Sequence, residues 1–294
     1  MPEALVSLAP LPVWLALIAA ALFGLQAVLA RQSVQTVDAQ TGALATILVA
    51  TLAFWSLSPW YIRVEFWSTP TMWIFLINGL FHPAMSMLFS FEANRRMGAT
   101  LSATIASSTP LFATAGAVLF LGEGLTTVIA VGTLGIVLGV VVLSWRTDGA
   151  MGSWPLWALI FPIGAAVVRA INHVWGRFGL EFLAEPVFAA TVSFTSSAVL
   201  SLLLWGLRRK PGQVRLNRRG LFWGACSGIT VFFAIWSMYA ALTTGTVVVV
   251  SPVISTYPIF TMVIVLLVGQ GRPGLRILAG VALTVGGVVL IGIQ

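Results

Sequence analysis

Apolar stretches of about twenty residues follow one another along almost the whole chain, separated by short polar connections. Each stretch is long enough to cross a hydrocarbon core of ~30 Å as a helix. In lipid every backbone polar group has to be satisfied inside the segment, which favours helices. The pattern therefore predicts ten transmembrane helices, at about 12–30, 42–61, 71–91, 98–121, 126–145, 154–175, 186–207, 221–242, 247–268 and 275–293.

One segment of the chain occurs twice. Gly98–Leu143 aligns with Gly245–Leu290 without a gap, and four glycines of the first copy fall on glycines of the second. Glycine recurs where a backbone turns or approaches another closely, so the matches indicate duplicated structure. Each half, 1–146 and 147–294, then holds five predicted helices. Because five is odd, the second half enters the membrane from the opposite side, and we expect an all-α membrane protein of two inverted repeats around a central cavity.

Composition agrees with a membrane protein, since 59% of the residues are hydrophobic and only 8% are charged, against about 25% charged in soluble domains. Met1–Leu11 has no basic region, so we expect no cleavable signal. The lone Cys226 excludes an intrachain disulfide. The net charge of +7 is better explained by membrane topology and lipid headgroups than by nucleic acid, which is not an expected partner.

The basic residues predict the orientation of the chain. The connections after odd-numbered helices hold twelve basic residues, whereas the opposite side of the membrane holds only Arg63 and Arg177. By the positive-inside rule those connections are cytoplasmic, so both termini are expected to be periplasmic. The twelve are Arg31, Arg95, Arg96, Arg146, Arg208, Arg209, Lys210, Arg215, Arg218, Arg219, Arg272 and Arg276.

The turn Leu121-Gly122-Glu123-Gly124, which follows Ser108-Thr109-Pro110-Leu111-Phe112, resembles the EamA repeat of the drug/metabolite transporter superfamily. The second copy departs from that repeat, with Gln270 where the repeat usually has glutamate. The length and the Trp-rich, His- and Arg-containing spans are most similar to the YddG-type aromatic amino acid exporters. The resemblance implies a secondary transporter of a bacterial-type inner membrane that exports small amphipathic metabolites, most of all aromatic amino acids, as a monomer and without a cofactor.

Ionisable side chains at membrane depth are costly and are therefore candidates for function. Arg169 lies about 7 Å from the middle of its predicted span. Asn172 and His173 share its helix face, being three and four residues further on. A planar guanidinium is suited to binding a substrate carboxylate through two hydrogen bonds. Alternatively, Arg169 snorkels outward or caps the carbonyls of a neighbouring helix.

The third span carries a second polar line. Asn78, His82 and Ser86 follow one another at intervals of four residues, with His82 near the midplane. Pro83 leaves the carbonyl one turn back without its helical partner, which gives a further acceptor in the same region. We therefore expect these three side chains to contact substrate; a packed, hydrogen-bonded histidine is the alternative.

Two further groups complete the predicted site. Ser107 and Tyr257 lie beside prolines that interrupt the fourth and ninth spans, and non-helical backbone at membrane depth is tolerated where it is buried or lines a cavity. Trp236 and Tyr239 form an aromatic stripe that would stack on an aromatic substrate. The alternatives are ordinary proline kinks for the first group and core packing for the second.

Catalytic signals are absent from the sequence. It contains no nucleophile elbow, zinc-protease motif, paired-cysteine motif or phosphate loop, and two histidines cannot fill a metal site alone. We expect no enzymatic activity, no metal and no nucleotide-driven pump. The function predicted is a secondary transporter for a small molecule; an integral-membrane enzyme and a non-transporting membrane subunit remain the alternatives.

Overall fold

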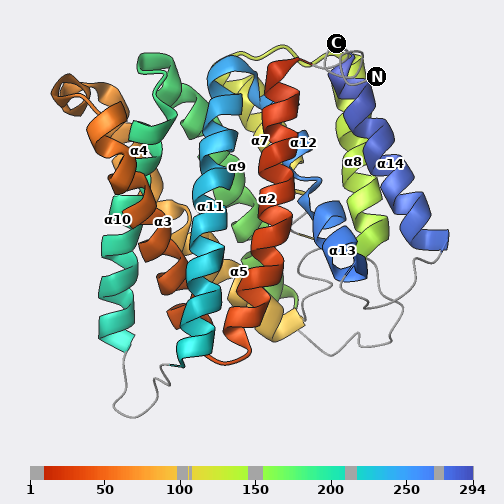
Figure 1. Cartoon of the computed structure of the whole chain (residues 1–294). Helices are drawn as coiled ribbons and strands as arrows, with labels where there is room; N and C mark the ends of the chain where they lie inside the picture. Colours follow the sequence, from red (N-terminus) through yellow and green to blue (C-terminus); the bar gives the residue numbers. More distant parts are fainter. Residues whose placement is uncertain are drawn as a thin grey trace.

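The chain folds into a bundle of helices in this computed structural model (Figure 1). The structure describes residues 10–97, 105, 108–144, 155–208, 217–267 and 275–293, and these contain helices and connections without a strand. Among the described residues, seven segments are long and apolar enough to cross a membrane. The shorter apolar helices Thr109–Leu121, Thr127–Val142 and Leu278–Gly292 supply the other spans of a ten-helix fold.

The helices of the first repeat are α2 (Leu11–Val34), α3 (Ala39–Tyr61), α4 (Pro70–Phe81), α5 (Ala84–Met97), α7 (Thr109–Gly116) and α8 (Thr127–Ser144), with short helical turns η1 (Val64–Ser68) and η2 (Ala117–Leu121). Those of the second are α9 (Ile160–Phe182), α10 (Pro186–Arg208), α11 (Arg218–Thr244), α12 (Val247–Ile254), α13 (Tyr257–Leu267) and α14 (Leu275–Gly292), preceded by η3 (Leu156–Leu159). The ten predicted spans are confirmed as seven long and three shorter apolar helices. Of the span predicted at 98–121, residues 98–104, 106 and 107 lie outside the described residues.

The two repeats are inverted relative to each other. We call the end of the bundle where α2 begins and α14 ends the terminal end, and the opposite end the far end (Figure 1). The first helix of the first repeat, α2, runs from the terminal end to the far end, whereas α9, the first long helix of the second, runs the other way. This arrangement follows from the odd number of spans in each repeat.

Proline explains why the third span is broken. Helix α4 ends at Phe81, and α5 begins at Ala84. His82, the residue before Pro83, has an extended conformation with φ −126° and ψ 130°, as expected for a residue that precedes proline. The carbonyl of Gly79 has no helical N–H to bond to, because residue 83, one turn further on, is proline. It accepts a hydrogen bond of 2.5 Å from Ser197 Oγ on α10 instead. That carbonyl is thus satisfied by a neighbouring helix and does not face the cavity as expected.

The breaks in the fourth and ninth spans are built alike. Ser108 precedes α7, and its hydroxyl donates to the Ile105 carbonyl at 2.7 Å. Ser255, the sequence-equivalent residue in the second repeat, follows α12 and donates to the Ser251 carbonyl at 2.9 Å. Serine hydroxyls compete for helical carbonyls in this way where a helix is interrupted. The duplicated sequence thus gives a duplicated break.

Helices of the two repeats pack closely against each other. Helix α8 lies along α14 (Figure 1), where a Cβ at Gly139 would lie 2.7 Å from the carbonyl oxygen of Gly280. Helix α2 packs along α11, and Ser33 Oγ donates to the carbonyl of Gly220 at 2.8 Å. Small residues allow such close contact between helices in a membrane.

The two repeats are also joined by a carboxylate at the terminal end. Glu123, in the turn after η2, accepts hydrogen bonds of 2.9 Å from the backbone N–H groups of Val247 and Val248, one to each carboxylate oxygen. These are the first two residues of α12. A carboxylate at this position satisfies backbone donors that have no helical partner and complements the positive end of the helix dipole.

Candidate functional site: a central cavity

A cavity of about 530 Å³ lies between helices of both repeats. This volume is in the range of small-molecule binding sites. Its wall is mostly apolar and consists largely of aliphatic and aromatic side chains. The polar side chains that line it include His82, Ser86, Arg169, Asn172, His173 and Tyr257. The central cavity of the predicted fold is therefore present, and it brings together polar residues from the third, sixth and ninth spans.

The cavity reaches from the middle of the bundle toward the far end. Phe23 and Gln26 line it from the half of α2 that is nearer the far end, and Val140 lines it from the last turns of α8. At the terminal end, Val13 and Leu242 are 1% and 0% exposed, so the helices are packed together there. Of the described residues that line the cavity, none lies in the first turns of α2 or the last turn of α11, at the end where Glu123 caps α12.

Arg169 extends from α9 into the cavity wall. Its guanidinium donates a hydrogen bond of 2.8 Å to Ser90 Oγ on α5. Ser90 in turn donates to the Ser86 carbonyl at 2.8 Å, so a short chain of hydrogen bonds along α5 holds the arginine. Within the described ranges Arg169 forms no ion pair, and Ser90 is the partner of one of its five N–H donors. In the part of the chain that the structure describes, the other guanidinium donors have no protein partner.

The polar line of the third span is divided by the helix break. His82 and Ser86 line the cavity, and Ser86 Oγ donates to the Pro83 carbonyl at 2.9 Å. Asn78 is fully buried and does not reach the cavity wall. The expectation that all three share one helix face is wrong in its geometry, because α4 ends before His82 and the four-residue spacing no longer applies.

Asn78 belongs to a buried hydrogen-bond network behind the wall. Its Nδ2 atom donates to Asn172 Oδ1 at 2.8 Å, and the Tyr239 hydroxyl donates to the same oxygen at 3.1 Å. Tyr239 is 1% exposed, and Asn172 is the member of the group that lines the cavity. Asn78 and Tyr239 therefore hold a cavity residue in place from behind.

His173 is joined to the broken ninth span. Its Nδ1 atom lies 2.8 Å from Ser251 Oγ on α12. With Arg169 and Asn172 it lines the cavity from one face of α9, as the helical spacing predicts. This spacing applies because α9 is a continuous helix from Ile160 to Phe182.

Of the other residues predicted for the site, one lines the cavity, one packs elsewhere and one is not described. Tyr257 lines the cavity from the first turn of α13. Trp236 is half-buried and packs on the rings of Tyr61 and Phe232, with centroids 5.9 and 5.8 Å away, while its neighbour Ile235 lines the cavity instead. Ser107 lies outside the described residues.

Two residues that the sequence did not single out support the polar side chains. Ser90 holds Arg169, and Ser251 holds His173. The first has a weak sequence signal, since it lies one turn after Ser86 on α5. The second directly precedes Pro252, which interrupts α12. In both cases the partner lies far away in the sequence, so the spacing alone cannot reveal the contact.

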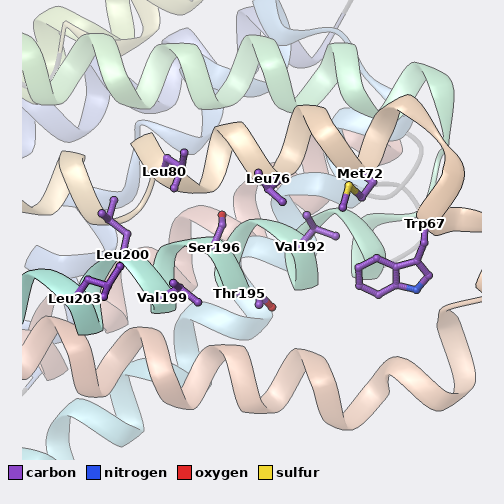
Figure 2. Close-up of a pocket in the computed structure, with 10 residues that line it drawn as sticks. All are labelled: Trp67, Met72, Leu76, Leu80, Val192, Thr195, Ser196, Val199, Leu200 and Leu203. Carbon is purple, nitrogen blue, oxygen red and sulfur yellow. The ribbon is translucent and has the colours of Figure 1, made fainter.

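A second hollow, of about 340 Å³, lies between α4 and α10 (Figure 2). Figure 2 shows Val199 and Leu203 on α10, with Leu80 across from them on α4. Val199 and Leu203 are 54% and 58% exposed, so the hollow lies on the outer surface of the bundle. The hydroxyl of Thr195 is bonded to its own helix, through the Thr191 carbonyl at 2.6 Å. This surface is suited to lipid hydrocarbon and offers no groups that would select a polar metabolite.

Two inverted repeats around a polar cavity define a class, the multi-spanning membrane transporters with internal repeats. The model of the EamA-like transporter family matches this sequence twice, at residues 10–145 and 156–293. The chain therefore belongs to the EamA-like transporter family, within the drug/metabolite transporter superfamily. It is a multi-pass membrane protein of a family that transports small molecules. The predicted resemblance to the EamA repeat is confirmed, and the narrower one to YddG-type exporters stays a prediction.

Other comparisons agree on the fold. A solved structure described as "Crystal structure of protein" is similar over 95% of this chain and 95% of its own, with a TM-score of 0.82 and 19% sequence identity. At that identity the similarity shows the fold alone. No curated protein matches the sequence significantly.

Proposed function

We propose that this chain carries amino acids, with a preference for aromatic ones, across a bacterial-type inner membrane through the central cavity. Substrate would bind between the repeats near the middle of the bundle. Rocking of the repeats about the broken fourth and ninth spans would expose it to one side and then the other. The proposal extends to function as a monomer, and to outward movement along the amino acid gradient, the direction that the YddG-type resemblance implies.

The proposed substrate class rests on the position and the hydrogen bonding of Arg169. Arg169 is partly buried and has no charged partner in the described ranges, and a bound carboxylate would supply one. Arg177, two turns further on the same helix, is a useful contrast. Its guanidinium donates to the carbonyls of Leu242 and Thr243 at 2.7 and 3.2 Å and pairs with Glu181 at 3.5 Å. Arg177 is thus a helix cap, whereas Arg169 lines the cavity and bonds to a single serine among the described residues.

The preference for aromatic substrates is supported by the apolar part of the wall. Phe23, Phe194 and Tyr257 line the cavity beside aliphatic side chains. Aromatic rings bury large apolar areas and favour edge-to-face and offset contacts with one another. In this proposal His82, Ser86, Arg169 and Tyr257 contact substrate directly. Asn78, Tyr239 and Trp236 then act from behind the wall, and Ser107 keeps its predicted contact with substrate.

Counterflow of labelled L-phenylalanine in liposomes tests the proposal. Purified wild-type protein should exchange L-phenylalanine and discriminate strongly against L-phenylalaninamide, which lacks the carboxylate. Arg169→Gln should lose this discrimination, and Arg169→Lys should keep part of it, because lysine keeps the charge but not the planar fork.

Arg31→Gln is the matched control, because Arg31 is an exposed arginine at the far end of α2. It should transport as the wild type does. If folded Arg169→Gln protein still prefers the acid over the amide, the carboxylate is not recognised by Arg169 and the amino acid assignment fails. If wild-type protein exchanges no solute, a non-transporting subunit or an integral-membrane enzyme becomes the better description.

A further inference from the structure

His173 has two ring nitrogens in different surroundings. The side chain is 6% exposed and lines the central cavity. Nδ1 lies 2.8 Å from Ser251 Oγ, and that serine is 0% exposed. No protein partner of Nε2 is found among the described residues. One nitrogen is therefore engaged by α12, while the other is left to the cavity.

The buried hydroxyl determines which nitrogen carries the proton. Within the described ranges Ser251 Oγ has His173 Nδ1 as its hydrogen-bond partner and no second one. Its proton is therefore satisfied only if Ser251 donates and Nδ1 accepts, because an unpaired buried hydroxyl proton is costly. A neutral imidazole that accepts at Nδ1 carries its proton on Nε2. His173 thus presents a fixed N–H donor to the cavity.

This donor lies on the same helix face as the guanidinium of Arg169. The two residues are four apart on α9, so their backbone positions differ by about 6 Å along the axis. A carboxylate placed between them would have one oxygen for each donor. Buried donors are nearly always paired, and this one has water or a ligand as its available partners.

We propose that His173 Nε2–H is the second donor to the substrate carboxylate bound by Arg169, and that Ser251 is the positioning residue that fixes the tautomer of the ring. The inference rests on the proposed function for the nature of the ligand. It adds a specificity-determining residue, and it couples the carboxylate site to α12, the first part of the broken ninth span. His173 then selects acids over amides together with Arg169.

Nitrogen-15 spectra of histidine-labelled protein in nanodiscs test the tautomer directly. The chain has two histidines, so a His82→Gln variant assigns both rings. In the ligand-free protein we expect His173 to be protonated at Nε2 and to accept at Nδ1. Ser251→Ala should give a mixture of tautomers, and Ser251→Thr, which keeps the hydroxyl, should restore the single one. Ser56→Ala, an exposed helical serine bonded to its own backbone, should leave the spectrum unchanged.

Binding of L-phenylalanine then tests the contact. Addition of the acid should shift the Nε2 resonance, and addition of L-phenylalaninamide should not. Ser251→Ala and His173→Gln should each weaken binding of the acid roughly tenfold, as expected for loss of a hydrogen bond to a charged group. Size-exclusion profiles establish that both variants are folded.

The outcomes separate this inference from the proposed function. A ring that carries its proton on Nδ1 in the ligand-free protein overturns the inference whatever the substrate is. Binding that depends on Arg169 but is equal in wild type, Ser251→Ala and His173→Gln overturns the inference and leaves the proposed function standing. If the acid binds with no dependence on Arg169, or does not bind, the proposed function fails, and the carboxylate contact of His173 fails with it.

Discussion

Polar side chains inside the bundle have two different uses. Asn78 and Tyr239 bond to Asn172 and face no open space, so they fix the position of helices around the cavity. Arg169 and His173 each form one hydrogen bond to protein in the described chain and direct their other donors toward the cavity. Depth in the membrane does not distinguish these uses. Whether the unpaired group meets the cavity does, because Asn78 Oδ1 also lacks a partner in the described chain but is buried away from the cavity.

The tyrosines provide a test of this difference. Tyr239→Phe removes a buried hydroxyl that donates to Asn172, and we expect it to lower the free energy of unfolding by about 1 kcal/mol. Tyr61→Phe, at a tyrosine that is 43% exposed, should change it by less than about 0.5 kcal/mol. Reversible unfolding of the purified variants in SDS measures both. Equal stability of the two variants would show that the network contributes nothing.

At the scale of helices, regular spacing predicted the site only where the helix is regular. It placed Arg169 and His173 on one face because α9 is continuous. It failed for Asn78 and His82 because Pro83 interrupts the span and α4 ends at Phe81, so the four-residue spacing does not place the two side chains on one face. Span positions were predictable from apolar length alone. The direction in which Trp236 points was not, since a helix that is apolar nearly all round gives no pattern that separates cavity, core and lipid.

The contact between α4 and α10 depends on glycine. A Cβ at Gly79 would overlap the carbonyl carbon of Ser193, which it would approach to 2.8 Å, next to the Ser197 bond that satisfies the Gly79 carbonyl. We expect Gly79→Ala to separate the helices and to destabilise the protein by about 1–3 kcal/mol. Thermal unfolding in detergent is the measurement.

Gly206→Ala on α10 is the control for that substitution, because a Cβ there meets nothing within 4 Å. Alanine favours helix over glycine by up to about 1 kcal/mol, so this variant should be as stable as wild type or slightly more stable. A Gly79→Ala protein that unfolds at the same temperature as Gly206→Ala would contradict the close packing of α4 on α10.

At the scale of the whole molecule, the basic residues and the cavity lie toward the same end. Arg31 and Arg218 are at the far end, toward which the cavity reaches. If the positive-inside rule holds, this is the cytoplasmic side and both termini are periplasmic. Alkaline phosphatase fused after Gln294 should then be active, and a fluorescent protein fused there should be dark. The reverse result would invert the orientation and leave the repeats unchanged.

The contact between the repeats at the terminal end is made by a residue that the second copy of the sequence does not repeat. Glu123 caps α12 with both carboxylate oxygens, whereas the duplicated sequence has the neutral Gln270 at the equivalent position. Charge-assisted hydrogen bonds at a helix N-terminus are stronger than neutral ones. We therefore expect the conformation closed at the terminal end to be favoured, and Glu123→Gln to weaken this closure while keeping the shape of the side chain.

A cysteine in place of Ala241, which is 0% exposed near the terminal end of α11, reports this closure in a Cys226→Ser background. Its reaction with a membrane-impermeant maleimide should be slow in that background and roughly fivefold faster with Glu123→Gln, as expected for a loss of about 1 kcal/mol. Gln270→Glu should likewise speed the reaction, because a carboxylate at the equivalent position would favour closure of the opposite end and so open the terminal end. Glu65→Gln, at an exposed glutamate of the same end, should have no effect. Equal rates in the Glu123 and Glu65 variants would mean that the carboxylate caps α12 without controlling which end is closed.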